Sequence, residues 1–191
     1  VEKALPLSDT SSIIAAVAQP SQNVILFLTT SPGIIEYKEG LLNNMKTADD
    51  QWKGGIDIKN FGRYAYILDP TGDQIWKYER KRTNYSNAIP YNQGADLSQA
   101  VSFAIDGALY VLAENGSLQK IFRGKKVDYS FKDLPSTKFQ GKNLKIKTTQ
   151  DFDFLYVLDP DNRRLLIFVK GDTSATYKKQ IIFNLPESEI P

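Results

Sequence analysis

The chemistry open to this chain is restricted because its 191 residues include no histidine and no cysteine. A serine–histidine–aspartate triad, a thiolate nucleophile and most zinc sites are therefore excluded. Carboxylates, lysines, tyrosines and hydroxyls remain. The most suggestive carboxylates are Asp69 and Asp159, each followed by a proline, and such groups could serve as a general acid or base or bind calcium.

The setting of Asp69 and Asp159 favours a structural interpretation. They stand at equivalent points of Asp69-Pro-Thr-Gly72 and Asp159-Pro-Asp-Asn162, and an aspartate at the start of a turn accepts hydrogen bonds from backbone N–H groups. The sequence also contains no calcium-binding loop of the EF-hand type. We therefore predict turn residues here, and no catalytic residue, metal site or cofactor in the chain.

The residues best suited to binding lie in predicted loops, where a rigid scaffold usually presents its functional side chains. Tryptophan, tyrosine and arginine most often carry the binding energy of protein interfaces. Trp52, beside Gly54 and Gly55, is the strongest single candidate, with packing against the rest of the fold as the alternative, whereas Trp76 is expected in the core. The predicted ligand-binding residues are Trp52, Lys53, Asp73, Gln74, Tyr91, Asn92, Gln93, Lys138, Phe139, Arg163 and Arg164.

These loops belong to a repeat that runs through the chain. Four apolar segments with a leucine at the same point align as predicted β-strands, and their leucines follow one another at 40, 44 and 46 residues, the length of a β-propeller blade. We predict that the four leucines are buried equivalents. The segments are 24–30, 64–70, 108–114 and 154–160, and the leucines are Leu28, Leu68, Leu112 and Leu158.

Each segment has the neighbours that a four-stranded blade requires. A turn rich in proline, glycine or asparagine follows it, and another apolar strand comes after the turn. The predicted first strands are 13–17, 56–58, 100–105 and 144–146, the third strands are 34–37, 75–78, 118–122 and 165–168, and the outer strands are 41–47, 85–90, 127–131 and 176–183.

These patterns predict an all-β fold, a β-propeller of about four four-stranded blades, because no stretch keeps helical periodicity over about 12 residues. A β-sandwich with the same strands is the alternative. We expect one propeller subdomain over 1–191, with blades at 8–50, 51–95, 96–135 and 136–185. In such blades the turns after the second strands and the loops between blades emerge on one face, where the candidate binding residues fall.

One blade also resembles a known family. The stretch Leu155-Tyr-Val-Leu-Asp-Pro-Asp-Asn-Arg-Arg-Leu-Leu-Ile-Phe168 is similar to NHL-type propeller blades, whose hallmark is an aromatic β-strand, an aspartate, a Gly/Asn turn and then Arg-Ile with a nearby aromatic. Residues 64–78 match more loosely. The whole chain resembles NHL and TolB-like propellers and the propeller tails of bacterial proteins with an upstream PPM-type phosphatase domain, which leaves an extracytoplasmic location open.

The resemblance implies a binding module for a protein, peptide, nucleic acid or glycan. We predict a non-catalytic binding or sensor module for a protein, peptide or glycan. A lactonase-like propeller enzyme is one alternative, although several such enzymes use histidine ligands, which this chain lacks. An RNA-binding NHL-type propeller is the other, but the basic stretches 77–82, 123–126, 138–147 and 178–179 are typical of solvated edges, and the net charge is only +2.

The last expectation concerns assembly. The pairs Leu5-Pro6, Leu134-Pro135 and Leu185-Pro186 occur in the same phase of the repeat, so we expect the four blades to form part of a larger ring or to close by homo-oligomerisation. No apolar run approaches the roughly 20 residues that span a bilayer, so direct membrane insertion is not expected.

Overall fold

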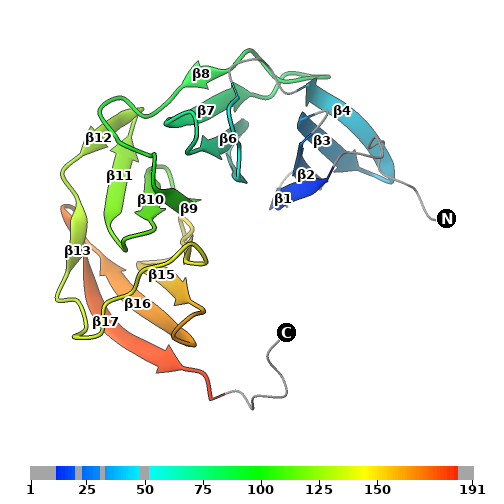
Figure 1. Cartoon of the computed structure of the whole chain (residues 1–191). Coiled ribbons are helices and arrows are strands. Elements are labelled where there is room, and N and C mark those ends of the chain that lie inside the picture. The colour runs from blue at the N-terminus through cyan, green and yellow to red at the C-terminus, as the bar shows by residue number, and fades with distance from the viewer. Residues whose placement is uncertain (1–11, 20–22, 31–32, 48–51, 185–191) are drawn as a thin grey trace. The chain divides into compact units, whose positions relative to one another are not determined.

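The computed structural model describes residues 12–19, 23–30, 33–47 and 52–184. All regular structure in these residues is β-strand, as predicted. The strands form four successive sheets, and in each sheet the four main strands are antiparallel and follow their order along the chain (Figure 1). The chain divides between Ser98 and Gln99 into two compact units, here called unit 1 and unit 2.

Unit 1 contains two four-stranded sheets. The first consists of β1 (Ile13–Gln19), β2 (Val24–Thr29), β3 (Gly33–Lys38) and β4 (Leu41–Thr47). The second consists of β5 (Asp57–Phe61), β6 (Tyr64–Asp69), β7 (Gln74–Glu79) and β8 (Ile89–Pro90).

Unit 2 repeats this arrangement with one addition. Its first sheet consists of β9 (Ala100–Ile105), β10 (Leu109–Ala113), β11 (Leu118–Phe122) and β12 (Lys125–Val127). Its second consists of β14 (Lys145–Lys147), β15 (Phe154–Asp159), β16 (Arg164–Lys170) and β17 (Ser174–Ile182). A short strand, β13 (Ser130–Lys132), pairs in parallel with β17 and makes this a five-stranded sheet.

The outer strands differ most from the prediction. The strand predicted over 41–47 is correct, but the one predicted over 127–131 is wrong, because β12 begins at Lys125 and β13 belongs to the next sheet. Arg123 and Gly124 have φ angles of 52° and 82°, so they form a tight two-residue turn that pairs Lys125 directly with Phe122.

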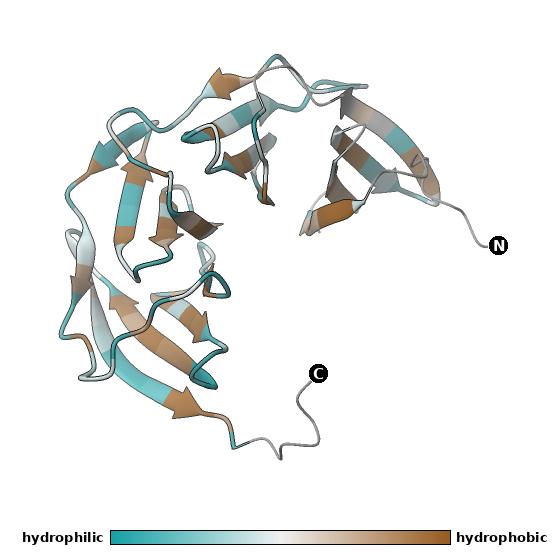
Figure 2. Cartoon of the chain, viewed as in Figure 1, coloured by the Kyte–Doolittle hydropathy of each residue, from teal (hydrophilic) through white to brown (hydrophobic). Residues whose placement is uncertain are grey.

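Each unit has one hydrophobic core between its two sheets. In unit 1 the core includes Leu28 of the first sheet and Ile67 of the second. In unit 2 it includes Leu112 and, from the second sheet, Val157 and Phe168. Apolar and polar bands alternate along the strands in Figure 2, as expected for strands whose successive side chains point to opposite faces.

Three of the four repeat leucines are buried as predicted. Leu28, Leu68 and Leu112 have no exposed surface, but Leu158 is 38% exposed. Its neighbour Val157 is fully buried, so strand alternation turns Leu158 to the opposite face of the sheet. Within the described part of unit 2 no further sheet follows β17 to cover that face, and the prediction for Leu158 is wrong for this reason.

The two leucines predict different losses of stability. Leu112→Ala should lower the free energy of unfolding by about 2–5 kcal/mol, because it leaves a cavity in the core of unit 2. Leu158→Ala should lower it by less than about 1 kcal/mol, because less apolar surface returns to water. Urea denaturation of both variants at micromolar concentration, followed by tryptophan fluorescence and circular dichroism, measures the difference. Equal losses would show that Leu158 is covered in solution.

Candidate functional site

In unit 1 the turn between β6 and β7 is organised by the fully buried carboxylate of Asp69. It accepts hydrogen bonds from the backbone N–H groups of Gly72 at 2.9 Å, Gly54 at 2.8 Å and Lys53 at 2.8 Å. Nε1 of Trp76 donates a further bond at 3.2 Å. One carboxylate therefore holds its own turn and the loop before β5 together. The predicted turn role of Asp69 and the core position of Trp76, which is 8% exposed, are both confirmed.

The buried side chain of Asn92 joins the same turn to the chain after β8. Its Oδ1 accepts hydrogen bonds from the backbone N–H of Ile75 at 3.2 Å and from Nε2 of Gln74, and its Nδ2 donates to the carbonyl of Asp73 at 3.0 Å. The backbone N–H of Tyr91 donates to the carbonyl of Ile75 at 2.9 Å. Asp73 and Gln74 thus form one cluster with Tyr91 and Asn92, and the side chain of Asn92 positions the others.

The two aromatic candidates of unit 1 are half-buried. Nε1 of Trp52 donates a hydrogen bond to the hydroxyl of Tyr78, and the two rings meet edge to face at 6.1 Å. Tyr91 meets Tyr66 edge to face at 5.4 Å, and Nζ of Lys77 lies 4.7 Å from its ring centroid. Burial, with Tyr91 close by, raises the pKa of Tyr66. Trp52 and Tyr91 therefore pack partly against the unit and leave only part of each ring to a ligand.

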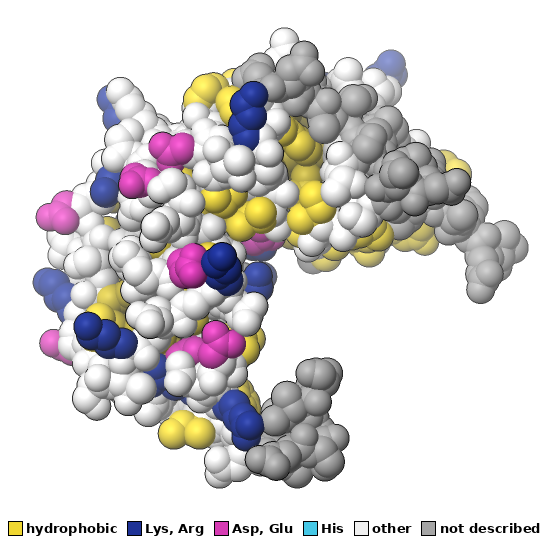
Figure 3. All heavy atoms as spheres, viewed as in Figure 1, with side chains coloured by type: hydrophobic (Ala, Val, Ile, Leu, Met, Phe, Trp, Pro, Cys, Tyr) yellow, Lys and Arg dark blue, Asp and Glu magenta, His cyan; other side chains and the backbone are white. Residues whose placement is uncertain are grey.

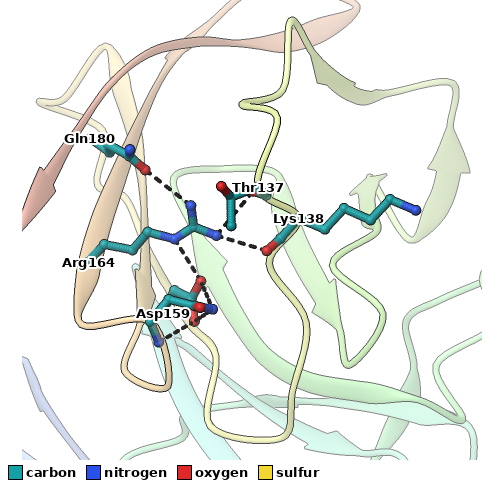
Figure 4. Close-up of polar contacts among 6 residues, drawn as sticks. Thr137, Lys138, Asp159, Arg164 and Gln180 are labelled. Carbon is teal, nitrogen blue, oxygen red and sulfur yellow. Dashed lines mark hydrogen bonds and ion pairs between the residues drawn. The ribbon is translucent and has the colours of Figure 1, made fainter.

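In unit 2 the corresponding turn, between β15 and β16, is held by an ion pair. Nε of the buried Arg164 donates to the buried carboxylate of Asp159 at 2.9 Å. Nη2 donates to the carbonyls of Lys138 at 2.9 Å and Thr137 at 3.2 Å, and Nη1 donates to Oε1 of Gln180 at 3.1 Å. Figure 4 shows the guanidinium between these partners. Arg164 therefore fixes the loop that carries Lys138.

Asp159 also has the turn role that was predicted for it. Its Oδ1 accepts a hydrogen bond from the backbone N–H of Asn162 at 3.4 Å, and its Oδ2 accepts one from Nδ2 of the same residue at 2.9 Å. Together with Arg164 these contacts occupy both carboxylate oxygens, so the group is a structural acceptor.

Asp73 and Arg163 occupy the same place in their turns. Their backbone N–H groups donate to the carbonyls of Pro70 and Pro160 at 3.1 and 2.9 Å. Both residues have a left-handed backbone, with φ of 50° and 48°, which projects the side chain outwards at a small conformational cost. The two units thus carry opposite charges at equivalent positions, but Oδ1 of Asp73 accepts a hydrogen bond from the backbone N–H of Leu97 at 2.5 Å.

The candidate residues divide by exposure into three groups. Those that reach solvent are Lys53, Asp73 and Gln93 in unit 1 and Lys138 and Arg163 in unit 2. Those that are half-buried are Trp52, Gln74 and Tyr91, and those that are buried are Asn92, Phe139 and Arg164. Phe139 belongs to the core of unit 2, beside Phe131 and Phe168.

Sequence reasoning missed a contact between the two loops of unit 2. Nδ2 of Asn143 donates to Oδ1 of the exposed Asp161 at 3.2 Å. Gly141, in the same loop, has a φ of 135°, a backbone conformation that glycine adopts more readily than other residues. The position of Asp161 in the Asp-Pro turn was visible in the sequence, but nothing in the spacing indicated the partner 18 residues earlier.

Among the described residues, no three carboxylates gather closely enough to hold a metal ion. The same residues contain no helix long and apolar enough to cross a membrane.

Solved structures resemble this chain along most of its length. A YCF48 protein bound to a D1 peptide aligns at 14% identity and a TM-score of 0.61, over 95% of this chain and 56% of that one. The WD40 β-propeller domain of Doa1 aligns at 14% identity and 0.60, over 90% and 54% of the two chains. The computationally designed Ika4 protein aligns at 10% identity and 0.57, over 88% and 96%.

These similarities assign the fold. The chain has β-propeller architecture, its four sheets are blades, and the sandwich alternative is excluded. The chain spans about half the length of the YCF48 and Doa1 chains it matches. No protein-family model and no curated protein matches the sequence.

The contacts of Arg164 predict a large stability effect. Arg164→Ala should lower the free energy of unfolding by about 3–5 kcal/mol, because it leaves the carboxylate of Asp159 buried without a counter-charge. Denaturant titration followed by circular dichroism measures the loss. A neutral result would show that the guanidinium is not needed for folding and is free to bind a ligand.

The adjacent Arg163 is the matched control. Arg163→Gly removes an exposed guanidinium and places glycine at a φ of 48°, where glycine is unstrained. The free energy of unfolding should therefore change by no more than about 0.5 kcal/mol.

Proposed function

We propose that this chain is a non-catalytic β-propeller module that binds a protein or peptide segment, with the β6–β7 turn of unit 1 and the β15–β16 turn of unit 2, and the loops beside each, as separate contact surfaces. The observation that carries the proposal is the combination of a rigid turn with an exposed side chain. Buried Asp69 and Asp159 fix the backbone of their turns, and Arg163 is exposed on the β15–β16 turn, whereas Oδ1 of Asp73 accepts a hydrogen bond from the backbone N–H of Leu97 at 2.5 Å. Preorganised loops lose little conformational entropy on binding. The YCF48 structure, which holds a D1 peptide, is a precedent for this use of the fold.

The charges of the exposed side chains favour an acidic ligand at unit 2. Lys138 and Arg163 are both exposed, and the guanidinium of Arg164 fixes the backbone that carries Lys138. The nearby carboxylate of Asp161 accepts a hydrogen bond from Asn143 and keeps its negative charge, so the two cations outnumber the one acid. A peptide carboxylate would form a charge-assisted hydrogen bond with either cation, and bonds of this kind are the strong ones.

The absence of catalysis is part of the proposal. The carboxylates of Asp69 and Asp159 accept hydrogen bonds from their own turns, so neither is free to transfer a proton. A lactonase-like activity would need side chains that hold a metal ion, and the described residues contain no such group.

RNA binding receives less support than protein binding. Basic and acidic side chains are interspersed over the described part of unit 2 on the face shown in Figure 3. A nucleic-acid surface gains affinity from many phosphate contacts on one continuous basic surface, and a mixed surface offers fewer.

The relation to NHL-type propellers is also a proposal. The ion pair between Asp159 and Arg164 joins the aspartate and an arginine of the motif, which gives the motif a physical purpose. The equivalent position in unit 1 holds Gln74, which reaches Asn92 instead. The TolB-like relation, the upstream phosphatase and a glycan ligand stay predictions from the sequence.

Peptide selection tests the proposed binding face. A random-sequence peptide display library selected on the purified chain should yield acidic peptides, and Arg163→Gly and Lys138→Ala should each weaken their binding roughly tenfold through the loss of one charge-assisted contact. Isothermal titration with the selected peptides measures the loss.

Arg82→Ala is the matched control, because Arg82 is an exposed cation in the loop between β7 and β8. Unchanged affinity in both Arg163→Gly and Lys138→Ala, or selection of peptides without acidic residues, would contradict the acidic-peptide proposal. Tight binding of single-stranded RNA with a steep dependence on salt would favour the nucleic-acid alternative.

Self-association is a separate proposal that rests on apolar surface. Three side chains of the second sheet of unit 2, Leu158, Val169 and Ile181, and Phe152 in the loop before β15 are between 38% and 44% exposed. In the first sheet of the unit, Leu112 occupies the position equivalent to Leu158 and is covered by the next sheet. We propose that a second copy of the chain covers the exposed face, because exposed apolar patches favour association.

Light scattering across a range of concentrations tests this proposal. The chain should form dimers or larger assemblies, and Leu158→Glu should shift it to monomer by placing a charge in the interface. Leu134→Glu, at a residue that is 52% exposed in the loop after β13, should leave the mass unchanged. A monomer at every concentration, with a cooperative melt, would contradict the proposal.

A further inference from the structure

The first sheet of unit 1 has an exposed apolar face. Ile25 of β2 pairs across strands with Tyr37 of β3, so the two side chains lie on the same face, and they are 37% and 38% exposed. The equivalent pairs in the second sheets of the two units are Ala65 with Tyr78 and Leu155 with Phe168. These four residues have no exposed surface, because they belong to the core that each second sheet shares with the sheet before it. The face that carries Ile25, Phe27 and Tyr37, here called the first-sheet face, is therefore of the kind that packs against a preceding sheet.

The exposed side of the second sheet in unit 2 is the complementary kind of face. Leu158 pairs through Leu165 with Ile181, and Phe154 pairs with Val169, so these side chains form one surface, here called the last-sheet face. Inside the units, the equivalents of Leu158 lie in the cores that the first sheets share with the sheets that follow them, and they are Leu28 and Leu112. The last-sheet face therefore needs a following sheet, and the first-sheet face of a second copy offers one.

A cavity of about 310 Å³ on the first-sheet face shows where the surfaces would interlock. Ala18, Val24, Ile25 and Tyr37 line it. Inside unit 1, Val24 belongs to the core with Ala65 and Tyr78, the equivalents of Ile25 and Tyr37. Phe154 occupies the position of Val24 in the last sheet, four residues before the repeat leucine, and it is half-buried. A phenylalanine at this position would meet Ile25 and Tyr37 of a second copy and enter the cavity beside them.

The charges beside the two faces are also complementary. Inside unit 1, Glu36 of the first sheet and Arg80 of the second form an ion pair at 2.7 Å, with side chains that are 3% and 18% exposed. Glu39 follows Tyr37 as Arg80 follows Tyr78, and it is exposed at the edge of the cavity. Its counterpart would be a cation near the position of Glu36 in the last sheet.

Lys179 provides that cation. The position of Glu36 is taken in the last sheet by Ile167, and Lys179 pairs with Ile167 across strands. Lys179 is exposed, and neither it nor Glu39 forms an ion pair with another described residue. A contact between copies would therefore repeat the ion pair of unit 1 with the two charges exchanged.

We infer that the last-sheet face of one copy packs against the first-sheet face of a second copy, so that the chain assembles head to tail. The inference rests on the self-association proposed above and names the surface that the second copy contributes. Such a contact is heterologous, because it joins two different surfaces, whereas a two-fold dimer would bring two last-sheet faces together. The occupant is a second copy because the chain itself carries both the sheet surface and the opposite charge that each face lacks.

Cysteine cross-linking distinguishes the two arrangements, because the chain contains no cysteine of its own. Leu158→Cys and Phe27→Cys are placed in separate copies, since their equivalents in unit 1, Leu28 and Ile67, both lie next to Gly55. The two variants are mixed under reducing conditions and then oxidised with diamide. The mixture should form a disulfide-linked heterodimer, and neither variant should cross-link alone. Leu134→Cys, at an exposed residue of the loop after β13, is the control and should not cross-link to Phe27→Cys.

The outcomes separate this inference from the proposal on which it rests. Cross-linking of Leu158→Cys with itself would show two last-sheet faces in contact and overturn the head-to-tail arrangement. The absence of a heterodimer, in a chain that light scattering shows to be assembled and circular dichroism shows to be folded, would overturn it as well and leave self-association standing. A monomer at every concentration would overturn both.

Charge reversal tests the ion pair between copies. Glu39→Lys and Lys179→Glu should each raise the dissociation constant of the assembly roughly tenfold, because like charges then meet in the contact. The chain that carries both changes should regain affinity to within about threefold of the original, since opposite charges face each other again. Sedimentation velocity across a dilution series measures the constants, and the melting temperature of each variant checks folding. A doubly changed chain that associates more weakly than either single variant would overturn the assignment.

Discussion

The buried carboxylate at the start of the Asp-Pro turn is the constraint on which the rest of this structure depends. A carboxylate taken out of water must have all its lone pairs occupied, or burial destabilises the fold. Asp69 meets this requirement with three backbone N–H groups and an indole, and Asp159 meets it with Asn162 and the guanidinium of Arg164. Each solution ties a turn to the loop that leads into its own blade, so the fold and the candidate binding face share the same contacts.

Much of the fold could be predicted because strand patterning and turn chemistry are local. The repeated leucine and the turn residues after it placed β2, β6, β10 and β15 within a residue or two of their observed bounds. Outer strands were harder, because the Arg123-Gly124 turn, rather than apolar pattern, sets where β12 begins. The exposure of Leu158 could not be predicted either. Burial of an apolar face depends on which sheet covers it, and the repeat pattern does not indicate the covering sheet.

The candidate site was predicted in part for similar reasons. Arg163 and Arg164 are adjacent in the sequence, but Arg163 is exposed and Arg164 is buried against Asp159. Residue type alone could not separate them, because both are cations in a predicted turn. Their repeat equivalents, Asp73 and the half-buried Gln74, show the same contrast in exposure, although Oδ1 of Asp73 accepts a hydrogen bond from Leu97. Comparing the two turns position by position is therefore a better guide to an exposed side chain than composition.

Comparing the two units also distinguishes shared from unit-specific features at the opposite ends of the strands. Lys77 lies over Tyr66 and Tyr91 in unit 1 as Lys120 lies over Tyr110 and Tyr129 in unit 2, and in both units the lysine pairs across strands with the first of these tyrosines. A lysine between two tyrosines is thus a structural feature of the repeat and needs no ligand to explain it. The turn beside it differs, with Gly62-Arg63 in unit 1 and Asp106-Gly107 in unit 2. The two units therefore differ at this end of the strands in the residues of the turn, because the aromatic frame is common to both.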